Sequence, residues 1–85
     1  MTDTFERLRA RLHKDFDMPV AALVPDATLE SLEVDSLRMI EVAFCAEEEF
    51  DVSMQEDHNA LRQRLKTLGD LAGYIDTLRE RTAAA

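Results

Sequence analysis

Hydrophobic residues recur along this chain at the three- and four-residue steps of amphipathic helices. The first series predicts a helix over residues 4–16 with one buried face. Its members are Phe5, Leu8, Leu12 and Phe16. The Met18-Pro19 step ends this helix, because a residue before proline avoids the helical region.

The central series contains two neighbouring hydrophobic stripes and predicts a helix over residues 36–50. One stripe is Met39, Val42, Ala46 and Phe50, and the second is Leu37, Ile40 and Phe44. Acidic residues occupy much of the remaining surface, so the exposed side of this helix is negative. Asp35 suits the N-cap position, since its carboxylate accepts hydrogen bonds from free first-turn amides. Ser36 is therefore expected at the helix start, with its hydroxyl in solvent.

A short helix and a final helix are expected in the remainder of the chain. Asp57 or Asn59 caps the short helix, which carries Leu61 and Leu65 four residues apart. Thr67 caps the final helix. The buried face of the final helix consists of Leu68, Leu71, Ala72, Ile75 and Leu78.

These series predict an all-α fold, a small four-helix bundle with three longer helices and one short helix. The 85 residues suit a single domain over residues 1–85, ordered from about 3 to 81, and the two glycines and two prolines are too few for a turn-rich sheet. A long loop, residues 17–34, joins the first and second helices. The apolar residues expected to pin this loop across one end of the bundle are Val20, Leu23, Val24, Leu29 and Leu32.

The net charge of −8 is concentrated in the middle of the chain. Residues 26–57 hold eleven acidic residues and one basic residue, whereas residues 58–85 carry a net charge of +2. A negative patch repels nucleic acid and anionic lipid and steers the protein toward basic protein surfaces. From this charge distribution we expect protein partners and no nucleic acid. The alternative is that the acidic residues form only a solvated face.

Residue usage also limits location and chemistry. No apolar run approaches the ~18 residues of a membrane span, and the first residues lack a signal-peptide pattern. We therefore expect a cytoplasmic protein without membrane insertion. We also expect the protein to be a monomer. His13 and His58 are isolated, which disfavours a zinc site. Ser36 has no evident histidine base, and the glutamates near Cys45 disfavour a thiolate. We therefore expect neither a metal site nor catalysis.

Ser36 itself has two interpretations. It is either a first-turn residue without chemistry or a modification site, because a helix N-terminus favours a phosphate ester. The surrounding string resembles the acyl carrier proteins, over roughly residues 5–78. The residues that carry the resemblance are Asp35-Ser36-Leu37, Ile40-Glu41 and Glu47-Glu48-Glu49-Phe50-Asp51. The resemblance implies that a separate Mg²⁺-dependent phosphopantetheinyl transferase attaches 4′-phosphopantetheine from coenzyme A to Ser36, and that the thiol of this arm carries acyl thioesters.

The same resemblance implies roles for other residues of the central helix. Asp35 completes the motif that the transferase recognises. The apolar positions that face partner enzymes are Leu37, Ile40 and Phe44. The acidic positions that meet basic docking surfaces on acyl-transferring enzymes are Glu41, Glu47 and Glu48. The candidates for the lining of an acyl pocket between helices are Val42, Ala43, Ala46 and Phe50, and their small members equally suit plain close packing.

Three departures from the family pattern indicate a specialised bacterial-type carrier. Glu33 stands where the family usually has glycine, and this departure is expected to stiffen the entry to the motif or to narrow the choice of transferase. Arg38 places a positive charge beside the docking surface. The segment over residues 50–74 is longer than in the common bacterial type. It carries a basic island that consists of Arg62, Arg64 and Lys66.

Three functions are compatible with the sequence. The first is a freestanding acyl carrier for fatty-acid, lipid or polyketide-type synthesis. The second is a peptidyl or aminoacyl carrier, a class that is usually less acidic than this chain. The third is an unmodified helical interaction module in which Ser36 is only a cap.

Overall fold

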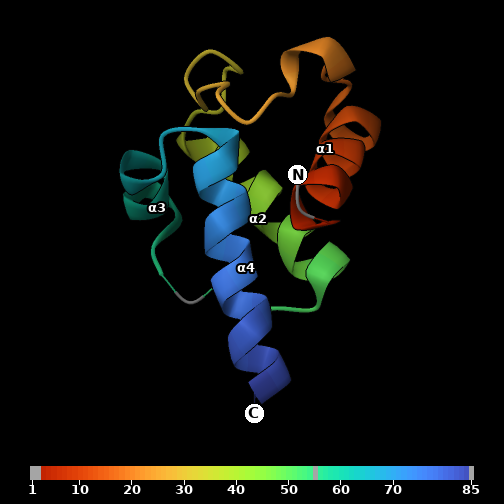
Figure 1. The fold of residues 1–85 in the computed structure, drawn as a ribbon. Coiled ribbons are helices and arrows are strands. Elements are labelled where there is room, and N and C mark those ends of the chain that lie inside the picture. Colours follow the sequence, from red (N-terminus) through yellow and green to blue (C-terminus); the bar gives the residue numbers. More distant parts are fainter. Residues whose placement is uncertain (1–2, 55, 85) are drawn as a thin grey trace.

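The computed structural model describes residues 3–54 and 56–84, with side chains to residue 81, and it is all-helical there. In chain order the elements are α1 (Asp3–Phe16), the 3₁₀ helix η1 (Val20–Ala22), α2 (Ser36–Phe50), α3 (His58–Arg64) and α4 (Leu68–Ala84). The prediction of three longer helices, one short helix and a long first loop is confirmed. Figure 1 shows α4 in front of α2, with α1 and α3 on either side.

The core lies where the helical stripes predicted it. From α1, Phe5, Leu8 and Leu12 are at most 3% exposed. The predicted face of α4 is buried as well, and Met54 packs into the same core from the linker after α2. Burial of these apolar side chains holds the bundle together, since each fully buried Leu, Ile or Phe contributes about 1.5–3 kcal/mol.

Aspartates define both ends of α2. The Asp35 carboxylate accepts a hydrogen bond of 2.8 Å from the Arg38 amide, so this residue is the N-cap, as predicted. Asp51 ends the helix in the left-handed conformation, with φ 54, and its amide donates to the Glu47 carbonyl. Aspartate tolerates this conformation better than most residues. The same conformation recurs at Asp17, directly after α1.

The loop between α1 and α2 is pinned by fewer side chains than predicted. Leu23 and Leu29 are buried, whereas Val20 and Val24 are 40% and 44% exposed. The prediction was wrong for these two valines, because no residue of the single turn η1 is buried and, of the two residues after it, only Leu23 is buried. Backbone hydrogen bonds fix the rest of the loop, including one of 2.9 Å from the Leu29 amide to the Lys66 carbonyl.

Close contact between the loop and α4 depends on a glycine. The Gly69 amide donates a 3.0 Å hydrogen bond to the Pro25 carbonyl. A Cβ at this position would lie 3.1 Å from the same oxygen, so a larger residue would push the two segments apart.

The starts of α3 and α4 follow the capping predictions. The Asp57 carboxylate accepts from the Ala60 amide, so Asp57, and not Asn59, caps α3. Thr67 Oγ1 accepts from the Asp70 amide, and the Asp70 carboxylate accepts from the Thr67 amide. This reciprocal pair fixes the first turn of α4. Asn59 is thereby left available for a different contact.

Candidate functional site

Ser36 is the first residue of α2, and its side chain is exposed. Its hydroxyl donates a 2.9 Å hydrogen bond to Oδ1 of Asn59 on α3. One turn further along α3, Nε of Arg62 donates a 2.5 Å hydrogen bond to the Val34 carbonyl, two residues before the serine. Two side chains of α3 therefore hold the segment that presents Ser36.

The backbone that leads into Ser36 has an unusual conformation at Glu33. Its φ is 60, in the left-handed region that favours glycine. The chain then turns sharply, with the Val34 amide bonded to the Leu29 carbonyl at 2.9 Å and the Val34 side chain buried. This conformation gives a physical reason for glycine at this position in the family pattern.

Three large apolar side chains of α2 remain exposed on the side that follows Ser36. Leu37 is 69% exposed, Phe44 is 60% exposed and Ile40 is 36% exposed. The Phe44 ring also makes an edge contact with the His58 ring of α3, with centroids 6.0 Å apart. An exposed apolar stripe of this kind is a typical feature of a protein-binding surface. We call Leu37, Ile40 and Phe44 the docking stripe.

The three acidic residues predicted to meet partners differ in availability. Glu48 is 77% exposed and lies 3.0 Å from Arg11, and Glu41 is 50% exposed and lies 3.6 Å from Arg38. Glu47 instead accepts a 2.8 Å hydrogen bond from the Met54 amide. The Glu47 carboxylate therefore binds the linker after α2, whereas Glu41 and Glu48 present their carboxylates at the surface.

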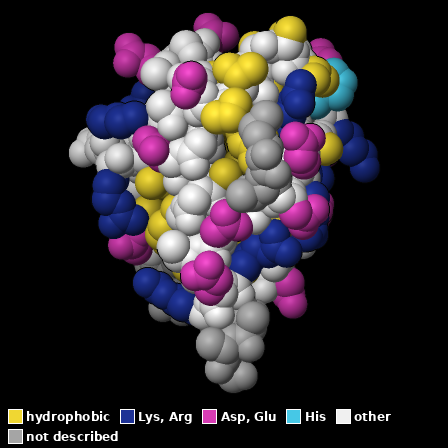
Figure 2. Space-filling model, in the orientation of Figure 1, with side chains coloured by type: hydrophobic (Ala, Val, Ile, Leu, Met, Phe, Trp, Pro, Cys, Tyr) yellow, Lys and Arg dark blue, Asp and Glu magenta, His cyan; other side chains and the backbone are white. Residues whose placement is uncertain are grey.

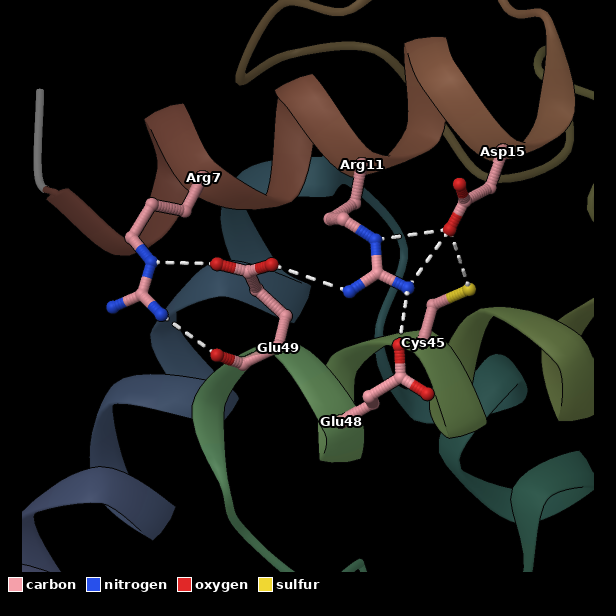
Figure 3. A network of polar contacts seen from close by, with 6 residues as sticks. All are labelled: Arg7, Arg11, Asp15, Cys45, Glu48 and Glu49. Carbon is pink, nitrogen blue, oxygen red and sulfur yellow. Dashed lines mark hydrogen bonds and ion pairs between the residues drawn. The ribbon is translucent and has the colours of Figure 1, made fainter.

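A network that the sequence did not reveal joins α1 to the far side of α2. Both carboxylate oxygens of Glu49 are used, one by Arg7 Nε at 2.8 Å and the other by Arg11 Nη1 at 3.2 Å (Figure 3). Arg7 also donates to the Glu49 carbonyl at 2.7 Å. The hydrogen bonds from Arg7 and Arg11 lower the pKa of Glu49 below its ordinary value of 4.5.

Arg7 and Arg11 lie off the buried stripe of α1, a position that is typical of solvated residues. The pattern that could have identified the network is the four-residue spacing of Arg7 and Arg11, which places both on one face of α1. The adjacent pair Glu48 and Glu49 at the end of α2 supplies the matching charges.

Cys45 lies in the same network and is half-buried. Its thiol donates to Asp15 at 3.4 Å (Figure 3). Burial, and then the hydrogen bond to Asp15, raise the pKa of the Cys45 thiol above its ordinary value of 9.0. The thiol therefore stays protonated near neutral pH.

The acyl-pocket candidates belong to the hydrophobic core. Their exposed fractions lie between 0% and 7%; the residues are Val42, Ala43, Ala46 and Phe50. A cavity of about 390 Å³ lies elsewhere, between the end of α1 and the loop, beside Phe16, Leu32 and Arg38. In this structure the four candidates therefore act as close-packed core residues.

The basic island does not form a uniform positive patch. Arg64 pairs with Glu56 at 2.7 Å and lies over the Tyr74 ring at 5.6 Å, and Arg62 is directed to the Val34 carbonyl. Figure 2 shows positive and negative side chains intermingled on the face around α4. Among residues 3–54 and 56–84, no helix is long and apolar enough to cross a membrane, and no group of three or more His, Cys, Asp or Glu side chains is placed to hold a metal ion.

Comparisons with known proteins assign the family. The family model of the phosphopantetheine attachment site matches residues 6–75. The chain is 39% identical over 59 residues to an acyl carrier protein of Acidothermus cellulolyticus, covering 68% of this chain and 67% of that protein. It is 27% identical over 75 residues to an acyl carrier protein of Helicobacter hepaticus, covering 87% of this chain and 95% of that protein.

A third relative has a different size. The chain is 34% identical over 73 residues to the non-reducing polyketide synthase Preu3 of Preussia isomera. The matched region covers 86% of this chain and only 3% of that synthase. The similarity therefore concerns one carrier-sized segment of a much longer protein.

The chain belongs to the family of proteins with a phosphopantetheine attachment site. Within that family it is an acyl carrier protein, as the curated relatives indicate. The predicted cofactor, 4′-phosphopantetheine, is confirmed by this membership. Proteins of this kind carry intermediates for enzymes and are not catalysts, which confirms the expectation for this chain.

Proposed function

We propose that Ser36 carries the 4′-phosphopantetheine arm and that the chain is a freestanding acyl carrier of fatty-acid, lipid or polyketide-type synthesis. The observation that carries this proposal is the exposed Ser36 hydroxyl at the first position of α2, directly after the capping Asp35. The position lies inside the segment that matches the attachment-site family. The monomeric state and the cytoplasmic location that we expect for this protein stay predictions.

The surroundings of Ser36 fit a phosphodiester. The serine lies at the positive end of the α2 dipole, where a negative group is favoured. The carboxylate of the preceding residue, Asp35, accepts from the Arg38 amide and so forms part of the helix cap. The hydroxyl is exposed, which an external transferase requires. When bound, the arm supplies a terminal thiol that forms thioesters with acyl groups.

The docking residues divide by chemistry. We propose that the docking stripe meets apolar surface on the transferase and on acyl-transferring enzymes. Glu41 and Glu48 meet basic residues around that surface, and Glu47 joins them only if its bond to the Met54 amide opens. Charged contacts at a rim mainly accelerate and orient the encounter, which suits a carrier that visits several enzymes.

The acyl pocket remains part of the proposal in a restricted form. Val42, Ala43, Ala46 and Phe50 are close-packed without an acyl chain. Binding of an acyl chain at these positions requires α2 to separate from a neighbouring helix, because protein interiors contain few voids of that size.

The peptidyl-carrier alternative is less favoured. The excess of acidic residues over 26–57 and the acyl carrier proteins among the relatives both point to acyl cargo. The match to a polyketide synthase keeps polyketide-type synthesis within the proposal.

The proposal is tested by incubating the chain with coenzyme A, Mg²⁺ and a phosphopantetheinyl transferase and measuring the intact mass. We expect the wild type to gain the mass of one 4′-phosphopantetheine and Ser36→Ala to gain none. Ser31→Ala is the matched control, since Ser31 is an exposed serine of the loop before α2, and it gains the mass as the wild type does. No gain on the wild type with several transferases would favour the unmodified interaction module.

A further inference from the structure

The contact between Ser36 and Asn59 changes its chemistry when Ser36 is modified. In the unmodified chain the hydroxyl is the donor and Oδ1 of Asn59 is the acceptor, at 2.9 Å. During attachment, Ser36 Oγ loses its proton and forms a bond to a phosphorus atom of coenzyme A. A P–O bond of the coenzyme A diphosphate breaks in the same reaction, and adenosine 3′,5′-bisphosphate leaves. The product has only acceptor oxygens at this position, so the original hydrogen bond is lost.

An asparagine can respond to that change without moving its backbone. Its amide carries an acceptor oxygen and a donor NH₂ group at nearly equivalent positions. Rotation of the Asn59 amide by about half a turn replaces the acceptor with a donor toward the phosphate. An aspartate at the same position would accept from the hydroxyl equally well but would repel the phosphate.

The adjacent turn of α3 supplies positive charge. Arg62 donates from Nε to the Val34 carbonyl, close to the serine in the chain. Among the described residues it forms no ion pair within 4.0 Å, unlike Arg64, whose charge is balanced by Glu56 at 2.7 Å. Arg62 therefore has no ion-pair partner there, and it contacts the backbone of the acidic segment just before the Asp35-Ser36-Leu37 motif.

We propose that Asn59 and Arg62 form a phosphate-binding wall on α3, in which Asn59 accepts from the Ser36 hydroxyl before attachment and donates to the phosphodiester afterwards. This inference rests on the proposed attachment at Ser36. It assigns a role to part of the basic island, namely the recognition of the arm by its phosphate. It also predicts that modification changes the contact between α2 and α3.

The test compares unmodified and modified protein in each of three chains: wild type, Asn59→Asp and Gln63→Glu. Gln63 lies on an exposed position of α3 one turn beyond Asn59, so Gln63→Glu adds the same negative charge to the same helix. The readout is the melting temperature of the modified form minus that of the unmodified form. Intact mass confirms modification of each sample first.

We expect this difference to be lower in Asn59→Asp than in the wild type by at least about 4 °C, a shift accessible in a domain of this size. The Gln63→Glu chain retains the wild-type difference. A role of Asn59 in folding alone would lower both forms equally and leave the difference unchanged, which would overturn the inference. Failure of the wild type to gain mass would instead refute the proposed function.

The side-chain amide of Asn59 provides a second readout in the wild type. In ¹⁵N-labelled protein, its NH₂ resonances move downfield on modification if the group becomes a donor to phosphate. Resonances that stay in place on modification would contradict the wall, whatever the melting temperatures show.

Discussion

The carboxylate of Glu49 on α2 lies 2.8 Å from Nε of Arg7 on α1, on the side of α2 away from the docking stripe. This pair, with Arg11, neutralises acidic charge at the end of α2 that would otherwise oppose helix packing (Figure 3). The acidic segment is therefore divided. Glu49 holds the bundle together, while Glu41 and Glu48 present charge at the surface.

The first prediction concerns the pH dependence of stability through Glu49. Its pKa is lower in the folded chain than its ordinary value of 4.5, so the stabilisation is present above that pH and is lost as the pH falls through the folded pKa. Glu49→Gln should unfold more easily at pH 7, by about 1 kcal/mol. The difference in stability between the wild type and Glu49→Gln should disappear as the pH falls below 4.5, the ordinary pKa value of this carboxyl group. Thermal or urea unfolding measures this difference.

The control for this prediction is Glu80→Gln, which removes the same charge from an exposed position of α4. Its stability should differ little from that of the wild type at any pH. A deficit of Glu49→Gln that is equally large at pH 7 and at pH 3 would show that charge pairing is not its cause.

The second prediction concerns the left-handed residue before the motif. Glu33→Gly should stabilise the chain by about 0.5–1 kcal/mol, because glycine removes the Cβ conflict at φ 60 but increases the entropy of the unfolded chain. Glu33→Ala removes the charge and keeps Cβ, so it should give no such gain. Equal stabilisation by both substitutions, in urea unfolding, would attribute the effect to charge and not to the backbone.

The third prediction concerns the reactivity of Cys45. Burial and Asp15 raise the pKa of its thiol, so alkylation of the folded, unmodified chain at pH 8 should be several-fold slower than alkylation of the urea-unfolded chain. Asp15→Asn should accelerate the reaction in the folded chain, since it removes the nearby negative charge. Equal rates for folded and unfolded wild-type protein would contradict the assigned environment.

The fourth prediction concerns the docking stripe. Phe44→Ala should lower kcat/KM for modification by a phosphopantetheinyl transferase about tenfold, as expected for loss of an aromatic anchor. Its effect on folding stability should be small, because Phe44 is 60% exposed. Val24→Ala is the matched control, since Val24 is 44% exposed but lies on the loop. If Phe44→Ala and Val24→Ala lowered kcat/KM by similar factors, the docking stripe would not be part of the surface that the transferase binds.

Local sequence features predicted the structure of α2 well. The start at Ser36 follows from a capping aspartate next to a helical stripe, and a cap acts over three residues. The buried faces of the helices followed from helical periodicity, which is also a local feature of the sequence. Such features depend on neighbours within one or two turns, so the sequence displays them directly.

The remaining features depend on how the helices pack, and the sequence does not display that. The Ser36–Asn59 contact spans 23 residues of chain. The contact forms only when α3 packs against the start of α2 and is rotated about its own axis so that Asn59 faces Ser36. The Arg7–Glu49 pair spans 42 residues and requires the matching rotation of α1. Side-chain periodicity gives a face for each helix, but it does not give the partner of each residue on that face.

The central claim is that Ser36 carries the arm, and the most direct test is the mass of the native protein isolated from its source. Fragmentation of the peptide that contains residues 34–40 locates any adduct. We predict the mass of 4′-phosphopantetheine on Ser36, with or without an acyl group on its thiol. A native protein of unmodified mass, or an adduct located on a different residue, would contradict the account.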